Sequence, residues 1–306
     1  MQETIVHKLS GAVAALFLMT VLTACGGGGG DGAGDGGAGD GAVTPATVDI
    51  GNGAAFLQRA YKLEVALVAL ALDVENTDGA CAVSGTVSLS TQGTTTTLLY
   101  SQCVSKVIGV TVKKNGSLKF VLNTGGNPGA TSGEISGSSL TISLGDRGQE
   151  AGAISGTASV SVSTMPGQSV YSISGGNISY TLDGKANSAS DMSLKLTDVE
   201  GTGYDISGGF KLNAPDLGGQ VTVSNSATAK LSGVLIADFP KQGQLMADGA
   251  TQTGSALTPL GDGSVSIEVN GTTVQDSLPW QLFLFSSGGA SGPGSGPGGN
   301  DAPPGS

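Results

Sequence analysis

The sequence predicts a mainly β protein, built from one long antiparallel sheet with a single N-terminal amphipathic helix packed on it. Two observations lead to this fold class. A stretch near the N-terminus repeats apolar residues with helical spacing, and the region after it alternates Val, Ile, Leu, Thr and Ser between Gly and Asn-Gly turn signals. Three arrangements of the sheet agree with this pattern: a meander, a sandwich or an open barrel. The domain is expected to span residues 45–286.

Residues 52–75 are predicted to form the helix. Their apolar residues recur at spacings of three and four, as on the buried stripe of an amphipathic helix: Phe56, Ala60, Leu63, Leu67, Leu70 and Val74. Asn52 is a suitable N-cap, and Arg59, Lys62 and Asp73 lie on the opposite side. We expect the helix to cover one face of the sheet. The alternative is that it closes an open barrel that carries lipid.

The first predicted hairpin contains two cysteines. From Cys81 to Leu89 the odd positions are mainly apolar and the even positions small or polar, as in a strand with one buried face. A three-residue loop, Thr91-Gln92-Gly93, places Gly at the left-handed position and makes Cys81 and Cys103 directly opposed residues. That spacing suits a disulfide. We therefore predict a Cys81–Cys103 bond in an oxidising compartment; two reduced, buried thiols are the alternative.

A second hairpin is predicted at Lys114-Asn115-Gly116. A three-residue loop there makes Val112 face Leu118 and Val110 face Phe120, whereas a two-residue loop would mix apolar and polar faces. Because register follows the hydrophobic pattern, we choose the longer loop.

A short unit, in which an aliphatic residue is followed by Ser and Gly, recurs through the β-rich region. It begins at these positions: Val83, Ile135, Ile154, Ile173, Ile206 and Leu231. The copies at 135, 154 and 173 are evenly spaced, which suits one strand pair or one coil per unit. Gly within a strand marks a bulge, a bend or a close backbone approach. We interpret the units mainly as bends in a long antiparallel meander.

The segment Asn213-Ala214-Pro215 predicts a boundary near residue 214. Beyond it, further strands are expected at four places: 219–224, 227–239, 264–270 and 278–283. These strands form either a small second domain or the completion of the first. Residues 287–306 are rich in Gly, Pro and Ser and are expected to be a disordered tail.

The segment Leu22-Thr23-Ala24-Cys25 ends an uncharged apolar stretch that is too short to span a membrane. It resembles the lipobox of bacterial lipoproteins. The resemblance implies that residues 1–24 are a signal peptide cleaved before Cys25, and that this cysteine carries a diacylglycerol and an N-linked acyl chain such as palmitate. Residues 25–44, mostly Gly, Ala and Asp, would then be a flexible tether. An ordinary secretory signal with an incidental cysteine is the alternative.

In this class, a residue other than Asp after the cysteine implies transport to the outer membrane, and here that residue is Gly26. We therefore expect a cell-envelope protein held in the outer membrane by its lipid, facing either the periplasm or the outside. Further pieces resemble uncharacterised Gly-tethered lipoproteins of Gram-negative bacteria: residues 81–85, Gln102-Cys103, Asn115-Gly116-Ser117, and 264–271 leading to Trp280. That family implies no function and no catalytic residue.

The composition excludes several classes of function. The net charge is -11 and there is no basic run, so we expect no nucleic-acid partner. The single histidine, His7, lies in the predicted signal peptide, which leaves no imidazole for a catalytic triad or a His-containing zinc site. With Cys25 lipidated and Cys81 bonded to Cys103, no thiolate nucleophile remains. We expect no catalytic residue, no metal site and no cofactor.

The sequence therefore predicts a non-catalytic, membrane-anchored envelope lipoprotein with a binding or structural β domain. Its partner beyond the membrane would be a protein, a glycan or a lipid ligand. The first alternative is a carrier of lipid or another apolar molecule. The second is a carboxylate-based glycosidase, which needs two acids about 5–10 Å apart. Several acids lie at predicted turns, where capping is the simpler explanation: Asp146, Asp183, Asp216 and Asp262.

Overall fold

A computed structural model describes most of the predicted domain, in six segments: 43–75, 81–122, 130–145, 150–182, 184–225 and 228–285. These residues belong to one compact unit. The predicted signal peptide, Cys25, nearly all of the predicted tether and the predicted tail lie outside them. Within the described part of the chain, no helix has the length and hydrophobicity needed to span a bilayer.

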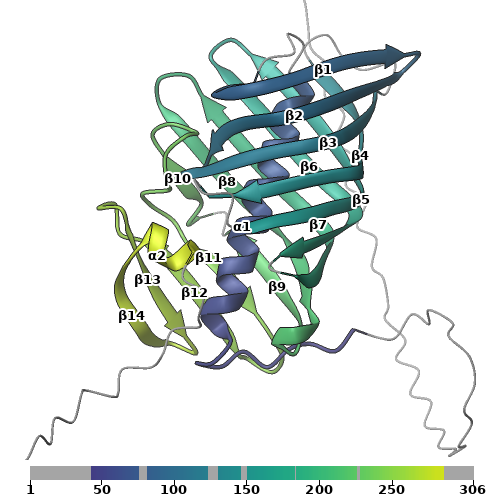
Figure 1. Ribbon diagram of the computed structural model, residues 1–306. Helices are drawn as coiled ribbons and strands as arrows, with labels where there is room; N and C mark the ends of the chain where they lie inside the picture. Colours follow the sequence, from purple (N-terminus) through teal and green to yellow (C-terminus); the bar gives the residue numbers. More distant parts are fainter. Residues whose placement is uncertain are drawn as a thin grey trace, which may run out of the picture. The chain divides into compact units, whose positions relative to one another are not determined.

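Within the described residues, the strands form one 14-stranded antiparallel sheet in which most strands pair with the next one along the chain (Figure 1). The first group is β1 (Ser84–Gln92), β2 (Thr95–Val107), β3 (Val110–Leu122), β4 (Ala130–Leu144), β5 (Glu150–Met165), β6 (Gln168–Leu182), β7 (Lys185–Val199) and β8 (Gly203–Ala214). The second is β9 (Gly219–Asn225), β10 (Leu231–Gly233), β11 (Leu245–Asp248), β12 (Gly254–Pro259), β13 (Ser264–Val269) and β14 (Thr272–Pro279). Only β10 leaves the path, because it pairs with β8. The predicted fold class is confirmed, with the strand order of a meander.

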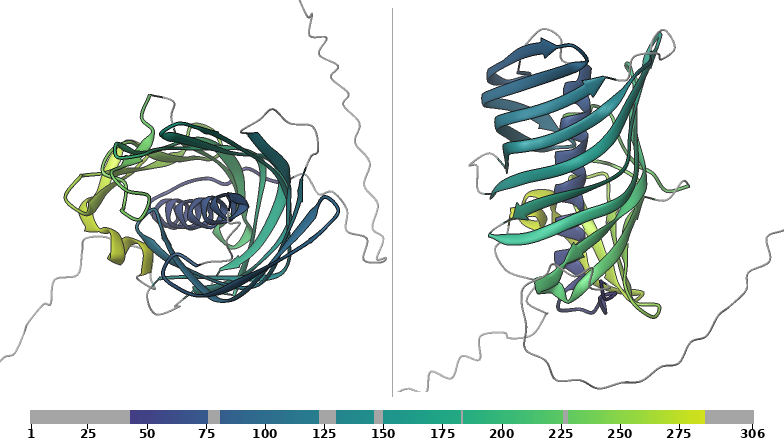
Figure 2. Two further views of the ribbon diagram at one scale, coloured as in Figure 1. Left: turned by 90° about the horizontal axis from the view of Figure 1, so that it is seen from above. Right: turned by 90° about the vertical axis from the view of Figure 1, so that its right-hand side faces the viewer.

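The predicted helix is present as α1 (Gly53–Leu72), followed by a 3-10 turn, η1 (Asp73–Glu75). Seen from above, the sheet curves around α1 (Figure 2). The helix packs on the inner face of the curved sheet, as predicted, but it is buried on nearly all sides: Lys62, expected on the open side, is 1% exposed. The reason is that a sheet of this length wraps around the helix it packs on.

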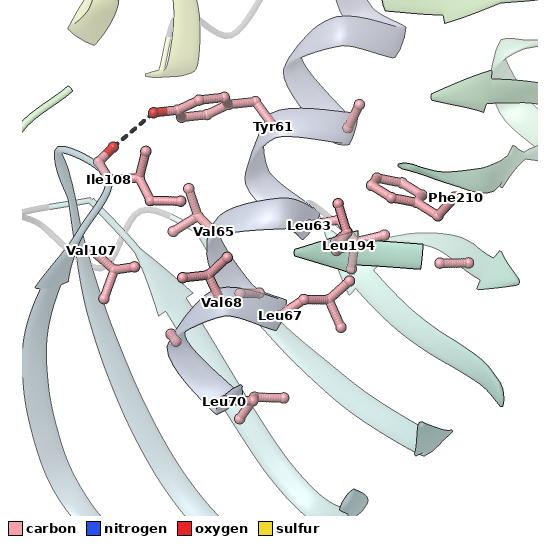
Figure 3. Close-up of a cluster of buried hydrophobic side chains, with 14 of the residues drawn as sticks. Tyr61, Leu63, Val65, Leu67, Val68, Leu70, Val107, Ile108, Leu194 and Phe210 are labelled. Atoms are coloured by element: carbon pink, nitrogen blue, oxygen red, sulfur yellow. Dashed lines mark hydrogen bonds between the residues drawn. The ribbon is translucent and has the colours of Figure 1, made fainter. Parts of the chain in front are cut away.

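Apolar side chains leave α1 in several directions (Figure 3). Val65 and Val68 point toward Val107 at the end of β2 and Ile108 in the turn after it, whereas Leu67 points toward Leu194. All of these residues are buried. The helix therefore occupies the interior of the rolled sheet.

The start of α1 is held by contacts to loops, not by a side-chain cap. Asn52 occupies the N-cap position, but its side chain makes no capping hydrogen bond. Its Nδ2 donates to the carbonyl oxygens of Thr47 (3.0 Å) and Leu217 (3.2 Å), and its Oδ1 accepts from the N–H of Asp49 (2.8 Å). The predicted N-cap position is confirmed, but the side chain bonds the preceding turn and Leu217 of the turn η2 (Pro215–Leu217) instead of capping the helix.

Bulges interrupt the pairing near the middle of most strand pairs from β1 to β8. The register shifts lie between Ser84 and Thr86, Tyr100 and Cys103, Asn115 and Ser117, Gly137 and Leu140, Thr157 and Ser159, and Ser190 and Lys195. These breaks adjoin one another across the sheet, and we call them the bulge seam. A bulge bends its strand and increases the local twist. The seam thus accounts for the curvature of the sheet around α1 (Figure 2).

The aliphatic-Ser-Gly units mark this seam in the sequence. Gly85, Gly156 and Gly208 have φ values of 90°, 107° and 92°. A Cβ on any of them would lie within 2.1 Å of a carbonyl oxygen on the neighbouring strand. The interpretation of the units as bends in an antiparallel meander is confirmed for the copies in the seam, whereas the copy at Leu231 lies on β10, whose pairing with β8 has no register shift. The evenly spaced copies, however, fall on β4, β5 and β6, so each unit corresponds to one strand and not to a strand pair or a coil.

The register of the first hairpin differs from the predicted one. β1 and β2 are joined by the two-residue turn Gly93-Thr94, and Val87 pairs with Tyr100 instead of Thr97. The predicted loop Thr91-Gln92-Gly93 was one residue too long. Gly93 has a positive φ of 62°, which both loop lengths require, so the sequence signal did not distinguish them.

The hairpin predicted at Lys114-Asn115-Gly116 does not form. These residues lie within β3, where the 99° φ of Gly116 belongs to the bulge seam. The chain reverses earlier, at Ile108-Gly109, whose φ values are 47° and 77°. A β-branched residue at positive φ is rare, so the sequence gives no turn signal there. A contact distant in sequence holds the turn: the N–H of Ile108 donates to the carbonyl oxygen of Ile236 at 2.6 Å.

The predicted disulfide is present between Cys81 and Cys103, with a Cα–Cα distance of 5.4 Å. The facing-pair argument for it was wrong, because Cys81 precedes β1 and has no strand partner. Instead, the N–H of Val83 donates to the carbonyl oxygen of Val104 at 2.9 Å and brings the incoming chain beside β2. The bond therefore fastens the start of the sheet's first edge.

Replacing both Cys81 and Cys103 with Ser should lower the free energy of unfolding by about 3 kcal/mol, because the bond closes a loop with a sequence separation of 22. Denaturant unfolding followed by circular dichroism measures this loss. Reductant should destabilise the native chain to a similar extent and leave the double variant unchanged. Equal stability of the two chains would contradict a stabilising role for the bond.

The strands beyond Pro215 continue the same sheet, since β9 pairs with β8 along its second half. The strands expected at 219–224 and 264–270 are confirmed as β9 and β13. Within the described part of 227–239, only β10 forms. The strand expected at 278–283 was wrong, because the chain enters the helix α2 (Trp280–Phe285). Trp280 packs there against Tyr61, with ring centroids 4.8 Å apart. The residues around Trp280 in the sequence do not predict this contact.

Candidate functional site

The residues singled out from the sequence do not gather at one place. Cys25, Asp146 and Asp183 lie outside the described residues. Asp262 has the expected turn role, because its Oδ1 accepts hydrogen bonds from the N–H (3.0 Å) and the hydroxyl (2.5 Å) of Ser264. The polar groups that do gather surround α1, and sequence reasoning noticed few of them.

Near its start, α1 is joined to the sheet by an arginine. Arg59 makes two hydrogen bonds to the carboxylate of Asp216, from Nη1 to Oδ1 (2.5 Å) and from Nη2 to Oδ2 (2.7 Å). Its Nη1 also donates to Oδ1 of Asn187 on β7 at 2.9 Å. The guanidinium holds the pKa of Asp216 below its ordinary value. Asp216 therefore does more than cap a turn: it pairs η2 with the helix.

At the other end of the helical segment, a buried ion pair joins η1 to β2 and β3. The Nζ of Lys114 and the hydroxyl of Tyr100 both donate to Oδ2 of Asp73, the latter at 2.7 Å. Lys114 is 1% exposed and Asp73 8%. Burial, together with the carboxylate of Asp73, raises the pKa of Tyr100, which keeps the hydroxyl a donor. Sequence reasoning placed Lys114 in an exposed turn and missed this pair.

One residue of η1 extends this fastening to β5 and β6. Glu75 accepts hydrogen bonds from the hydroxyl of Tyr171 at 2.5 Å and from the hydroxyl of Thr164 at 2.6 Å. Burial and the adjacent carboxylate raise the pKa of Tyr171. The hydroxyl therefore stays protonated and continues to donate to the carboxylate of Glu75.

The middle of α1 carries a carboxyl group with an incomplete set of partners. Glu64 is fully buried, and its Oε1 accepts a hydrogen bond of 2.9 Å from Nδ2 of Asn225 at the end of β9. Its Oε2 and the Oδ1 of Asn225 make no hydrogen bond. Desolvation raises the pKa of Glu64 to about 7, against a smaller opposing effect of Asn225. The sequence signal was available, because Glu64 is an acid inside an otherwise apolar run of α1.

One small pocket lies between α1 and the sheet. The pocket lined by Lys62, Leu63 and Ala66 on the helix, and by β4, β5 and β6 opposite, has a volume of about 20 Å³. That is room for one water molecule. Larger hollows of about 320 Å³ and 440 Å³ are lined mainly by polar residues, including Asp205 and Lys241 in the first and Asp248 in the second.

The described residues contain no cluster of three or more His, Cys, Asp or Glu side chains that could hold a metal ion. The two buried acids, Glu64 and Asp73, lie nine residues apart on one helical segment, which separates them by about 13 Å along its axis. A glycosidase pair is closer, at about 5–10 Å. The observed polar groups fasten a helix inside a sheet.

These features define the structural class of the protein: an antiparallel β roll whose interior is filled by a helix. No family model, curated protein or solved structure matches the chain.

Proposed function

We propose that this protein is a non-catalytic, lipid-anchored protein of the cell envelope, whose β domain serves as a binding or structural module. The lipobox Leu22-Thr23-Ala24-Cys25 supports the anchor. The observation that carries the rest is that α1 fills the interior of the roll. A domain filled in this way offers partners its outer surface.

The filled interior also weighs against the lipid-carrier alternative. α1 stands where an apolar ligand would lie, and the space beside it, about 20 Å³, is too small for an acyl chain. To admit a ligand, the helix would have to leave, which breaks the contacts of Arg59, Asp73 and Glu75 with the sheet. Partners on the outer surface, a protein or a glycan, fit better.

The outer surface of the middle strands is rich in hydroxyl groups. Ser159, Ser174 and Ser193 are paired neighbours across β5, β6 and β7, and all three are exposed. Ser155 and Ser179 form a second such pair nearby. Neighbouring strands lie about 4.8 Å apart, so these side chains form a close array of donors and acceptors. Such a surface suits a polar partner, for example a glycan.

The anchor and the absence of a bound lipid are tested by mass. The full chain should carry a diacylglyceryl group and an acyl chain on Cys25 after cleavage of residues 1–24. The anchor-free mature chain, meaning residues 25–306 with Cys25→Ala exported behind an unrelated signal peptide, should show in native mass spectrometry its calculated mass less two protons for the disulfide. Intact mass and acyl-chain labelling measure the first result.

Two controls separate these readouts. A chain with Ser in place of both Cys81 and Cys103 should still be acylated, whereas Cys25→Ala in the full chain should abolish labelling. An unmodified Cys25 in the full chain would contradict the anchor. A reproducible extra mass in the lipid range on the anchor-free mature chain would instead favour the carrier.

A further inference from the structure

Glu64 is placed where an ionised carboxylate has no compensation. It lies in the apolar middle of α1, fully buried, and faces Asn225 on β9. One hydrogen bond joins the two side chains, from Nδ2 of Asn225 to Oε1 of Glu64. The remaining two oxygens, Oε2 of Glu64 and Oδ1 of Asn225, are both acceptors and both lack a partner. Buried acceptors without a donor are unfavourable.

A single proton on Oε2 of Glu64, donated to Oδ1 of Asn225, would give both oxygens a hydrogen bond. A protonated carboxyl group has one O–H donor, and the acceptor that would receive it belongs to the amide already bound to Oε1. Acid and amide then face each other through two parallel hydrogen bonds. We propose that Glu64 and Asn225 form a neutral acid–amide pair that fastens α1 to β9, and that loss of the proton as pH rises loosens the helix within the roll.

The surroundings leave the proton as the compensating group. The titratable groups that face Glu64 are Tyr61 on α1 and Tyr204 on β8, and burial raises the pKa of both. Their hydroxyls donate elsewhere, to the carbonyl oxygens of Ile108 at 2.7 Å and Asp238 at 2.8 Å. Neither tyrosine therefore stabilises an ionised Glu64.

The neighbouring cation in α1, Lys62, lies two positions before Glu64, and side chains two positions apart on a helix do not face each other. The Nζ of Lys62 lies over the ring of Phe285, 5.7 Å from its centroid. Burial raises the pKa of Glu64 from 4.5 to about 7. Because the folded state then holds this proton more tightly than the unfolded state, folding stability decreases as pH rises between these two values.

The chain carries its own reporter of the helix. Its single tryptophan, Trp280, lies against Tyr61, one turn before Glu64, and stacks on Phe239 with ring centroids 5.0 Å apart. A shift of α1 would change this aromatic contact, whereas the contacts of Arg59 and Asp73 would retain the two ends of the helix. The expected change is thus local loosening and not unfolding.

The test follows Trp280 emission and the thermal midpoint of the anchor-free mature chain from about pH 5 to about pH 9. Emission should change with a midpoint near pH 7, and the thermal midpoint should fall mainly between about pH 5 and about pH 7. Glu64→Gln replaces the acid by an amide that can keep both hydrogen bonds at every pH. This variant should show flat emission and a higher thermal midpoint than the native chain above pH 7.

Glu200→Gln is the matched control, because Glu200 is exposed in the turn after β7; it should keep the native profile. Infrared spectroscopy of the native chain provides a readout that needs no variant: the band of a protonated carboxylic acid should be present below pH 7 and disappear above it. Absence of that band below pH 7, or a Glu64→Gln chain that keeps the native pH profile, would overturn the proposal.

Discussion

Replacing Lys114 with Met should lower the free energy of unfolding of the anchor-free mature chain by about 3–5 kcal/mol. Lys114 and the hydroxyl of Tyr100 are the two donors to Oδ2 of Asp73, and all three residues are buried. Removing the cation leaves the carboxylate in a low-dielectric site with one neutral donor. The thermal midpoint, measured by circular dichroism, should fall on the order of 10 °C.

A double variant separates loss of the charge pair from loss of packing. Asp73→Asn together with Lys114→Met removes both charges and leaves an acceptor for Tyr100, so it should recover much of the stability lost in the single variant. Lys119→Met, at an exposed position of the same strand, should change little. A double variant as unstable as Lys114→Met would show that packing, and not the unpaired carboxylate, explains the effect.

The second large effect is expected in the bulge seam. Gly176→Ala should lower the free energy of unfolding on the order of 4 kcal/mol. Gly176 has a φ of 70°, and a Cβ there would lie 2.0 Å from the carbonyl oxygen of Thr157 on β5. The two strands would have to separate, which breaks pairing at the point where the sheet bends. Denaturant unfolding measures the loss.

The adjacent glycine is a matched control. Gly175 has a similar φ of 62°, but a Cβ there would meet nothing within 4 Å. Gly175→Ala should therefore show only the strain of a left-handed residue, about 1 kcal/mol. If both variants lost the same stability, the left-handed backbone would explain the effect, and the close approach of β5 and β6 would not.

Both predictions concern features that keep the roll filled. The seam bends the sheet around α1, and the buried contacts of Asp73 hold the helix in place. Stability of this arrangement matters for the proposed function, because a fixed helix leaves the outer surface as the place for partners. The anchoring of the chain through Cys25 stays a prediction, since that residue lies outside the described part of the structure.

The sequence by itself determined the features that depend on neighbours along the chain. The spacing of apolar residues in 52–75 predicted α1, and alternation with turn residues predicted the long antiparallel sheet. The aliphatic-Ser-Gly units predicted bends, because glycine within a strand has a local conformational meaning. The pairing of Cys81 with Cys103 was also correct, although the register used to argue it was not.

Only the tertiary structure decided features that depend on residues distant in sequence. The turn at Ile108 is held by Ile236, and Lys114 is buried because it meets Asp73 from the helical segment. Bulges shift the register of most strand pairs from β1 to β8, and the glycines that mark these bulges do not say which residues pair on either side of them. The hydrogen bond that Glu64 accepts likewise comes from Asn225, which lies 161 residues away in sequence. The burial of a side chain and its interaction partners depend on the assembled fold, and a short stretch of sequence does not determine either of them.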